Sequence, residues 1–138
     1  MHDAERIVHE LSAMWNSKDV DRIETLFASD AVHEGITSGV KLHGVSAIRD
    51  LFSGTWQAIP DVRVEVKSVI SQGESVAWEW TMTATHTGDF PDLPATGRPF
   101  SIDGVSVLRI VGGKILSQRD YYDQASFLSQ VGALPTGD

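Results

Sequence analysis

Two carboxylates near the end of the chain are the first residues whose type and position suggest chemistry. Asp120 and Asp123 lie three positions apart at the end of the last predicted strand. In a dry pocket a carboxylate can act as a general base, because desolvation raises its pKa toward neutral pH. Three positions of a regular strand place two side chains on opposite faces, unless a bulge intervenes. An aspartate that follows a strand also commonly caps a helical turn, which is the competing interpretation of Asp123.

His86 is the second candidate for chemistry. It shares a strand face with Trp78 and Trp80, by the two-residue period of a strand, and should point inward or lie at a pocket rim. There it could donate to, or protonate, a carbonyl oxygen of a substrate. The alternative is a histidine at a loop edge, satisfied by the backbone. His33, His43 and His86 lack ligand spacing and no acid completes a motif, so we expect no metal site.

The elements that must position these residues are helices first and strands afterwards. Apolar residues recur at helical spacing within 7–15, 20–27 and 46–58, and Pro60 ends the third helix. A short extended piece is expected around 31–34, before the third helix. Strands with a period of two follow within 62–67, 76–86, 100–111 and 114–123. This order is typical of an α+β fold, and the twist of such long strands curls an antiparallel sheet. The helices then close one end and leave an apolar pocket, or the large side chains simply pack against the helices.

Composition excludes several classes of function. The 138 residues suit one domain spanning 1–138, and no linker divides them. With 11 basic and 19 acidic residues the net charge is −8, which disfavours nucleic acid and anionic membranes. The absence of cysteine excludes disulfides and thiolate metal sites. No signal peptide or membrane span is recognisable, so we expect a cytoplasmic protein.

Several stretches of the chain resemble the SnoaL-like polyketide cyclase family. They are Trp15-Asn16, Ile59-Pro60-Asp61, Thr85-His86-Thr87-Gly88, Pro94-Ala95-Thr96-Gly97-Arg98 and Gly113-Lys114-Ile115. They cover nearly the whole chain in order. The resemblance implies the cone-shaped α+β barrel of the NTF2-like superfamily, with about three N-terminal helices packed into a strongly curved antiparallel sheet. It also implies a homodimer formed through the outer face of the sheet.

The same resemblance implies an intramolecular aldol ring closure without cofactor or metal. A carboxylate removes a proton beside a carbonyl, and the enolate attacks a second carbonyl of the same small apolar or aromatic substrate. Counting back nine positions from Gly132 reaches Asp123, where the family places an aspartate. We therefore predict Asp123 as the base and His86 as its partner. The predicted substrate-binding residues are His33, Phe52, Trp56, Trp78, Trp80, Phe100, Arg119 and Tyr121.

The segment around Arg119 departs from the family pattern, which has tryptophan at this position. Residues 118–123 instead resemble the ending of limonene epoxide hydrolases. Those enzymes need an Arg-x-Asp pair where this chain has Trp80-Thr81-Met82, so epoxide hydrolysis by their triad is disfavoured. Arg119 either binds an anionic substrate or forms a surface ion pair with Asp120 or Glu79. A hydrolase or dehydratase of the scytalone type and a non-catalytic binding module stay open as alternatives.

Overall fold

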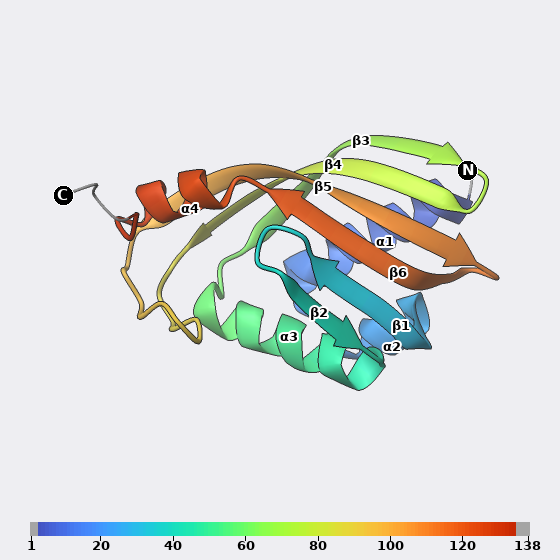
Figure 1. The fold of residues 1–138 in the computed structure, drawn as a ribbon, viewed down its shortest axis with the longest axis horizontal. Helices are drawn as coiled ribbons and strands as arrows, with labels where there is room; N and C mark the ends of the chain where they lie inside the picture. The colour runs from blue at the N-terminus through green and yellow to red at the C-terminus, as the bar shows by residue number, and fades with distance from the viewer. Residues whose placement is uncertain (1–2, 135–138) are drawn as a thin grey trace.

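A computed structural model describes residues 3–134 as four helices and one six-stranded sheet (Figure 1). The helices are α1 (Asp3–Ser17), α2 (Asp21–Leu26), α3 (Val45–Ala58) and α4 (Gln124–Gln130). The strands are β1 (Phe27–Gly35), β2 (Val40–His43), β3 (Arg63–Gln72), β4 (Ser75–Thr85), β5 (Pro99–Val111) and β6 (Lys114–Tyr122). Their order in the sheet is β2-β1-β6-β5-β4-β3. The predicted α+β fold is confirmed.

The sheet is mixed, whereas the sequence predicted an antiparallel one. β1 and β6 run parallel, and every other neighbouring pair is antiparallel. The sequence pattern indicated only a short extended piece before the third helix, where the structure has the β1–β2 hairpin. The parallel pair places His33 opposite Gln118, two residues before Asp120. This contact across the sheet is what assembles the site described below.

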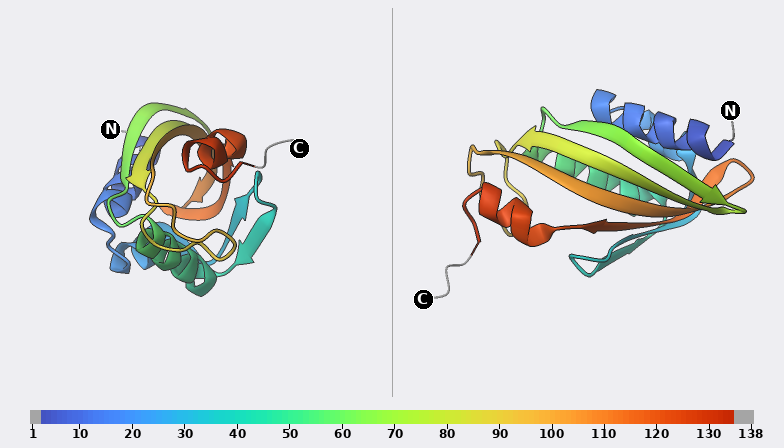
Figure 2. Two further views of the ribbon diagram at one scale, coloured as in Figure 1. Left: turned by 90° about the vertical axis from the view of Figure 1, so that its left-hand side faces the viewer. Right: turned by 90° about the horizontal axis from the view of Figure 1, so that it is seen from above.

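Seen end-on, the long strands form a strongly curved sheet, and the helices complete the closed outline of the molecule (Figure 2). α1 packs on β3, and α3 packs on β1 and β2. α4 packs on β5 at the end of the molecule where the 86–98 loop also crosses (Figure 2). None of the helices within residues 3–134 is long and apolar enough to span a bilayer.

An aromatic core fills the space between the curved sheet and the helices. The ring centroid of Trp15 lies 5.0 Å from that of Phe52 and 5.5 Å from that of Trp56. Phe27 meets Phe52 edge to face at 5.9 Å. These contacts bury the apolar faces of α1 and α3 against the sheet, so the helices fix the positions of the inward-facing strand residues.

A bulge sets which residues of β6 face this core. The pairing of β5 with β6 shifts register between Arg109 and Ile110, so β6 carries one extra residue there. Beyond the bulge Gln118, Asp120 and Tyr122 share the inner face by strand alternation. Arg119 lies between them on the exposed outer side.

Candidate functional site

The carboxylate of Asp120 is held by neighbours on three strands. Ser106 Oγ donates a hydrogen bond to Oδ1 over 2.6 Å, and Gln118 Nε2 donates to the same oxygen over 2.9 Å. Nε2 of His33 lies 3.2 Å from Oδ2. Both carboxylate oxygens therefore have polar contacts, and the two oxygens have different partners.

Strand register explains why these four residues meet. Ser106 of β5 pairs with Asp120 of β6, and His33 of β1 pairs with Gln118 of β6. Gln118 and Asp120 are two residues apart and so share a face. The site is thus built on rigid strands, where packing holds side chains in one geometry.

The neighbours of Asp120 are buried, whereas its own side chain keeps limited access. His33, Ser106 and Gln118 are 5%, 2% and 3% exposed, and the Asp120 side chain is 22% exposed. Burial raises the pKa of Asp120, but the contact and charge of His33 and the hydrogen bonds from Ser106 and Gln118 outweigh burial. The pKa therefore lies below its ordinary value, and Asp120 is an ionised proton acceptor at neutral pH.

Tyr122 follows Asp120 on the same face of β6. Burial raises the pKa of the Tyr122 phenol, and the negative charge of Asp120 raises it further. The phenol therefore stays protonated at neutral pH and can donate but not carry charge.

Trp80 is connected to Asp120 through the hydroxyl of Ser106. Its Nε1 donates to Ser106 Oγ over 2.9 Å. The indole lies against Gly104, where an added Cβ would come within 2.3 Å of ring atoms. Trp80 was expected as a pocket wall, and the structure gives it this polar contact in addition.

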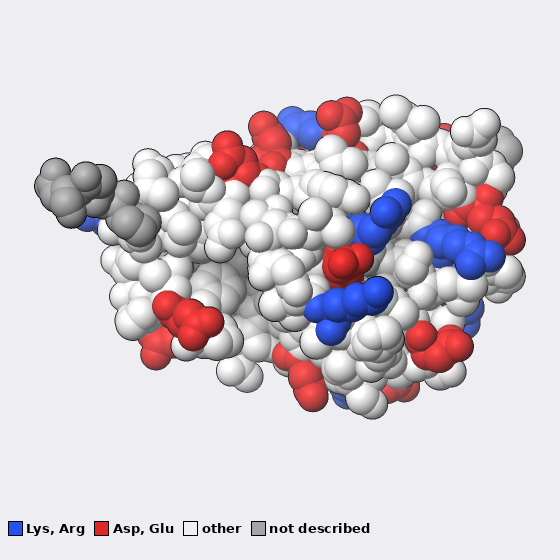
Figure 3. All heavy atoms as spheres, viewed as in Figure 1, with Lys and Arg blue, Asp and Glu red and all other residues white. Residues whose placement is uncertain are grey.

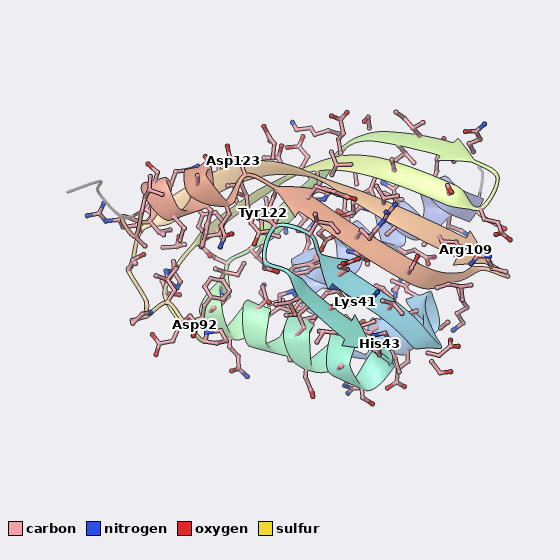
Figure 4. The ribbon with its side chains drawn as sticks, viewed as in Figure 1. Lys41, His43, Asp92, Arg109, Tyr122 and Asp123 are labelled. Carbon is pink, nitrogen blue, oxygen red and sulfur yellow. The ribbon has the colours of Figure 1, made fainter. Side chains whose placement is uncertain are left out.

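Asp123 lies apart from the Asp120 contacts. β6 ends at Tyr122, and Asp123 is the exposed N-cap of α4 (Figure 4). Its Oδ1 accepts a hydrogen bond from the backbone N–H of Ser126 over 2.9 Å. This exposed location is unlike the dry pocket that the prediction for Asp123 requires, whereas Asp120 lies among buried polar side chains.

His86 is fully buried but belongs to the other end of the sheet. Its ring stacks on Phe90 with centroids 5.1 Å apart, and Nδ1 lies 3.1 Å from Thr96 Oγ1. Along β4, His86 comes eight residues after Trp78, which pairs with Ser106 beside the site. Eight strand residues span about 26 Å of chain. The structure therefore does not bring His86 and Asp120 together.

The other predicted substrate-binding residues divide between two faces. Phe52, Trp56, Trp78 and Phe100 are buried in the core, and the Phe52 ring meets that of His33 at 5.5 Å. Arg119 and Tyr121 face outward, since they alternate with Asp120 on β6. Within residues 3–134 no ion pair joins Arg119 to Asp120 or Glu79. Arg119 instead pairs in register with Glu34. The face drawn in Figure 3 carries both acidic and basic side chains.

Two hollows of the surface lie away from Asp120. One, of about 510 Å³, is lined by residues at the ends of β4 and β5 together with Asp61 and Gln130. The other, of about 280 Å³, is lined by residues of β3 and β4. Neither is walled by tryptophans, whose rings pack against other aromatic side chains. Among residues 3–134 no group of three acidic or histidine side chains is arranged to hold a metal ion.

Four buried ring nitrogens have no hydrogen-bond partner in the described part of the chain. Nε2 of His33 has only its charge contact with Asp120, and the others are Nε1 of Trp56, Nε1 of Trp78 and Nε2 of His86. An unsatisfied buried donor costs about 1–3 kcal/mol, so native proteins rarely keep several. These nitrogens are groups that ligand oxygens could satisfy if the core opened to admit them.

Ser106, Gln118 and Tyr122 are the site residues that the sequence did not single out as functional. Ser106 lies in a stretch, Gly104-Val105-Ser106, that contributes to the family resemblance, but nothing local marks its hydroxyl as a donor. Gln118 has a signal in the sequence, because its two-residue spacing from Asp120 on one strand places both side chains on the same face.

Comparisons with known proteins agree on one family. The profile of the SnoaL-like polyketide cyclase family matches residues 5–131. Nogalonic acid methyl ester cyclase of Streptomyces nogalater is 31% identical over 103 residues, which cover 73% of this chain and 72% of that protein. Aklanonic acid methyl ester cyclase DnrD of Streptomyces peucetius is 43% identical over 47 residues, 34% of this chain. That match spans only 32% of the length of DnrD.

A solved structure extends the likeness to the whole fold. AclR of Streptomyces galilaeus superposes on this chain with a TM-score of 0.82 at 31% identity. It is described as a putative hydroxylase. The superposition covers 96% of this chain and 97% of AclR. The chain belongs to the SnoaL-like polyketide cyclase family.

Proposed function

We propose that this protein is a cofactor-independent polyketide ester cyclase with Asp120 as its general base. The observation that carries the proposal is the ionised carboxylate of Asp120, fixed by Ser106 and Gln118 and contacted by His33. A positioned base removes a proton without a metal or cofactor, if the carbon acid is activated by the substrate itself.

The low pKa of Asp120 limits the carbon acids that it can deprotonate. Proton transfer is efficient when base and acid are matched, so a weak base suits a carbon between two carbonyl groups. The C–H bond breaks, the proton binds the carboxylate and the electron pair passes into the enolate. The enolate carbon then attacks a ketone of the same molecule, and the new alkoxide takes a proton. The substrate and the product are isomers.

The substrate class follows from the relatives' names and from the core. The relatives are named for methyl esters of nogalonic and aklanonic acid. The unpartnered nitrogens of Trp56 and Trp78 suit an aromatic ligand that carries carbonyl or phenol oxygens. Phe52 would then stack on its rings.

A homodimer through the outer face of the sheet is part of the proposal. Tyr121, Ile36 and Val40 are large apolar residues exposed on or beside β6, β1 and β2. Burial of such residues against a second copy is favourable. Light scattering should give twice the chain mass of 15.1 kDa, and a value near that mass would contradict a dimer. A cytoplasmic location stays a prediction.

The test of the activity is turnover of nogalonic and aklanonic acid methyl esters by the purified protein. A cyclase yields a product of unchanged mass with a new ring, identified by NMR. Asp120→Asn should abolish turnover, whereas Asp123→Asn should retain it. If Asp123→Asn lost turnover and Asp120→Asn kept it, Asp123 would be the base. A product that has gained water, gained one oxygen atom or lost water would indicate a hydrolase, hydroxylase or dehydratase instead.

A further inference from the structure

We infer that Trp80 and Ser106 form a one-way chain of hydrogen bonds that occupies Oδ1 of Asp120 and reserves Oδ2 for the substrate's proton. The inference rests on the proposed function of Asp120 and adds two positioning residues to it. Neither residue has to touch the reacting atoms, since each acts through the carboxylate.

The direction of these hydrogen bonds, from Trp80 to Ser106 to Asp120, follows from the donors available. The indole Nε1–H can only donate, and a serine hydroxyl has one proton. Trp80 Nε1 donates to Ser106 Oγ over 2.9 Å, so the Ser106 proton is free to point at Oδ1 of Asp120, 2.6 Å away. Ser106 is 2% exposed, so bulk water does not compete for its hydroxyl.

The two oxygens of Asp120 are therefore not equivalent. Oδ1 accepts from both Ser106 and Gln118, which use its two acceptor sites. Oδ2 has only the contact with Nε2 of His33. A proton taken from a carbon acid adds more readily to the oxygen with a free acceptor site, which is Oδ2. The electron pair of the C–H bond passes to the enolate while the proton binds Oδ2.

Gly104 is what allows Trp80 to reach Ser106. Trp80 pairs with Gly104 across β4 and β5, and Ser106 lies two residues further along β5 on the same face. Because Gly104 has no side chain, the indole can occupy the space where a Cβ would lie and present Nε1 to Ser106. A residue with a Cβ would push the ring away from this position.

The chain of hydrogen bonds should fix the orientation of the Asp120 carboxylate and lower its proton affinity. Hydrogen bonds to a carboxylate favour its charged form. Without the Ser106 hydroxyl, Oδ1 loses one donor and the carboxylate can turn about its last side-chain bond. The titratable groups that face Asp120 are His33 from β1 and Tyr122 from β6, and neither is altered by changing Ser106 or Trp80.

The test is NMR titration of the Asp120 carboxyl carbon in the substrate-free protein. Ser106→Ala should raise the titration midpoint by about one pH unit, the effect of losing a hydrogen bond to a charged group. Trp80→Phe keeps a ring but removes the N–H, and should raise the midpoint less. Because Trp80 acts through Ser106, adding Trp80→Phe to Ser106→Ala should cause no further shift. Ser101→Ala, on the exposed side of β5, is the matched control.

Activity supplies a second readout with nogalonic acid methyl ester. Ser106→Ala should lower kcat while KM changes little, and should move the acid limb of the kcat/KM profile to higher pH. An unchanged Asp120 titration in Ser106→Ala, or an additive shift in the double variant, would overturn the inference. Since the titration needs no substrate, absence of turnover would reject the proposed function alone and leave the titration to decide the hydrogen-bond chain.

Discussion

His33 and Asp120 lie on neighbouring parallel strands, and Nε2 of His33 is 3.2 Å from Oδ2 of Asp120. The residues are 87 positions apart in the chain, so only the folded sheet brings them together. In the unfolded chain Asp120 has neither this contact nor the donors on Oδ1. Its proton affinity therefore differs between the two states, and that difference makes stability depend on pH.

The first prediction concerns the sign of that dependence. The folded pKa of Asp120 is lowered, so its stabilising contribution is present above the unfolded pKa of about 3.9 and is lost as pH falls through the folded pKa. Urea unfolding should show the free energy of unfolding declining below about pH 4, and Asp120→Asn should decline less steeply.

Asp61 provides the matched comparison. Hydrogen bonds from the backbone and side chain of Thr85 lower its pKa too. Asp61→Asn should therefore also flatten the acid decline, but it should leave turnover intact because Asp61 does not contact the site. An acid decline that is unchanged in Asp120→Asn would show that the contact with His33 and the donors on Oδ1 do not persist in solution.

The second prediction tests the packing of Trp80 on Gly104. Gly104→Ala would place a Cβ about 2.3 Å from the indole, so the ring must move. Overpacking of this kind costs roughly 1–3 kcal/mol, and the intrinsic tryptophan fluorescence and the Asp120 titration should change with it. Gly54→Ala is the control: Gly54 lies on the exposed side of α3 with open space around it, and the change should stabilise by about 0.5–1 kcal/mol. Equal effects at both positions would contradict the close approach.

The third prediction separates the cap of α4 from catalysis. Asp123→Ala removes the acceptor for the Ser126 N–H and should lower the free energy of unfolding by about 0.5–2 kcal/mol. Asp123→Asn keeps a capping oxygen and should cost much less. Urea unfolding measures both, and turnover of the ester substrates should survive in each. A loss of kcat in Asp123→Asn at unchanged stability would give Asp123 a chemical role after all.

Much of the fold was predictable because side-chain periodicity is a local signal. The helical spacing of Ile48, Phe52 and Trp56 predicted α3, and the alternation of Trp78 and Trp80 predicted the inner face of β4. The parallel pairing of β1 with β6 was not predictable in this way, since no local pattern connects His33 with Asp120.

The choice between Asp120 and Asp123 depended on two details that sequence patterns specify poorly. One is the residue at which β6 ends, because a strand ending at Tyr122 leaves Asp123 to begin a helix. The other is the bulge between Arg109 and Ile110, which decides which positions of β6 face inward. The family resemblance pointed to Asp123 rather than to Asp120, and it named no neighbours of either, so Ser106 and Gln118 became apparent only from the structure.

The fourth prediction concerns the unpartnered nitrogen of Trp78. Its Nε1 is buried without a hydrogen-bond partner among residues 3–134. Trp78→Phe removes a donor whose burial costs about 1–3 kcal/mol and also removes part of a packed ring, which costs a similar amount. The two effects oppose each other, so the melting temperature should change little. If an oxygen of the ligand accepts from Nε1, KM for nogalonic acid methyl ester should rise, by about tenfold for a hydrogen bond of ordinary strength.

Trp80→Phe is the contrast, because Nε1 of Trp80 already donates to Ser106. There the hydroxyl of Ser106 loses a donor inside the protein, so the melting temperature should fall. An equal fall in both variants would mean that Nε1 of Trp78 has a partner in the free protein, such as an ordered water. A smaller fall for Trp78→Phe, together with an unchanged KM, would mean that the ligand does not reach Trp78 and that its oxygens are bound nearer to Asp120.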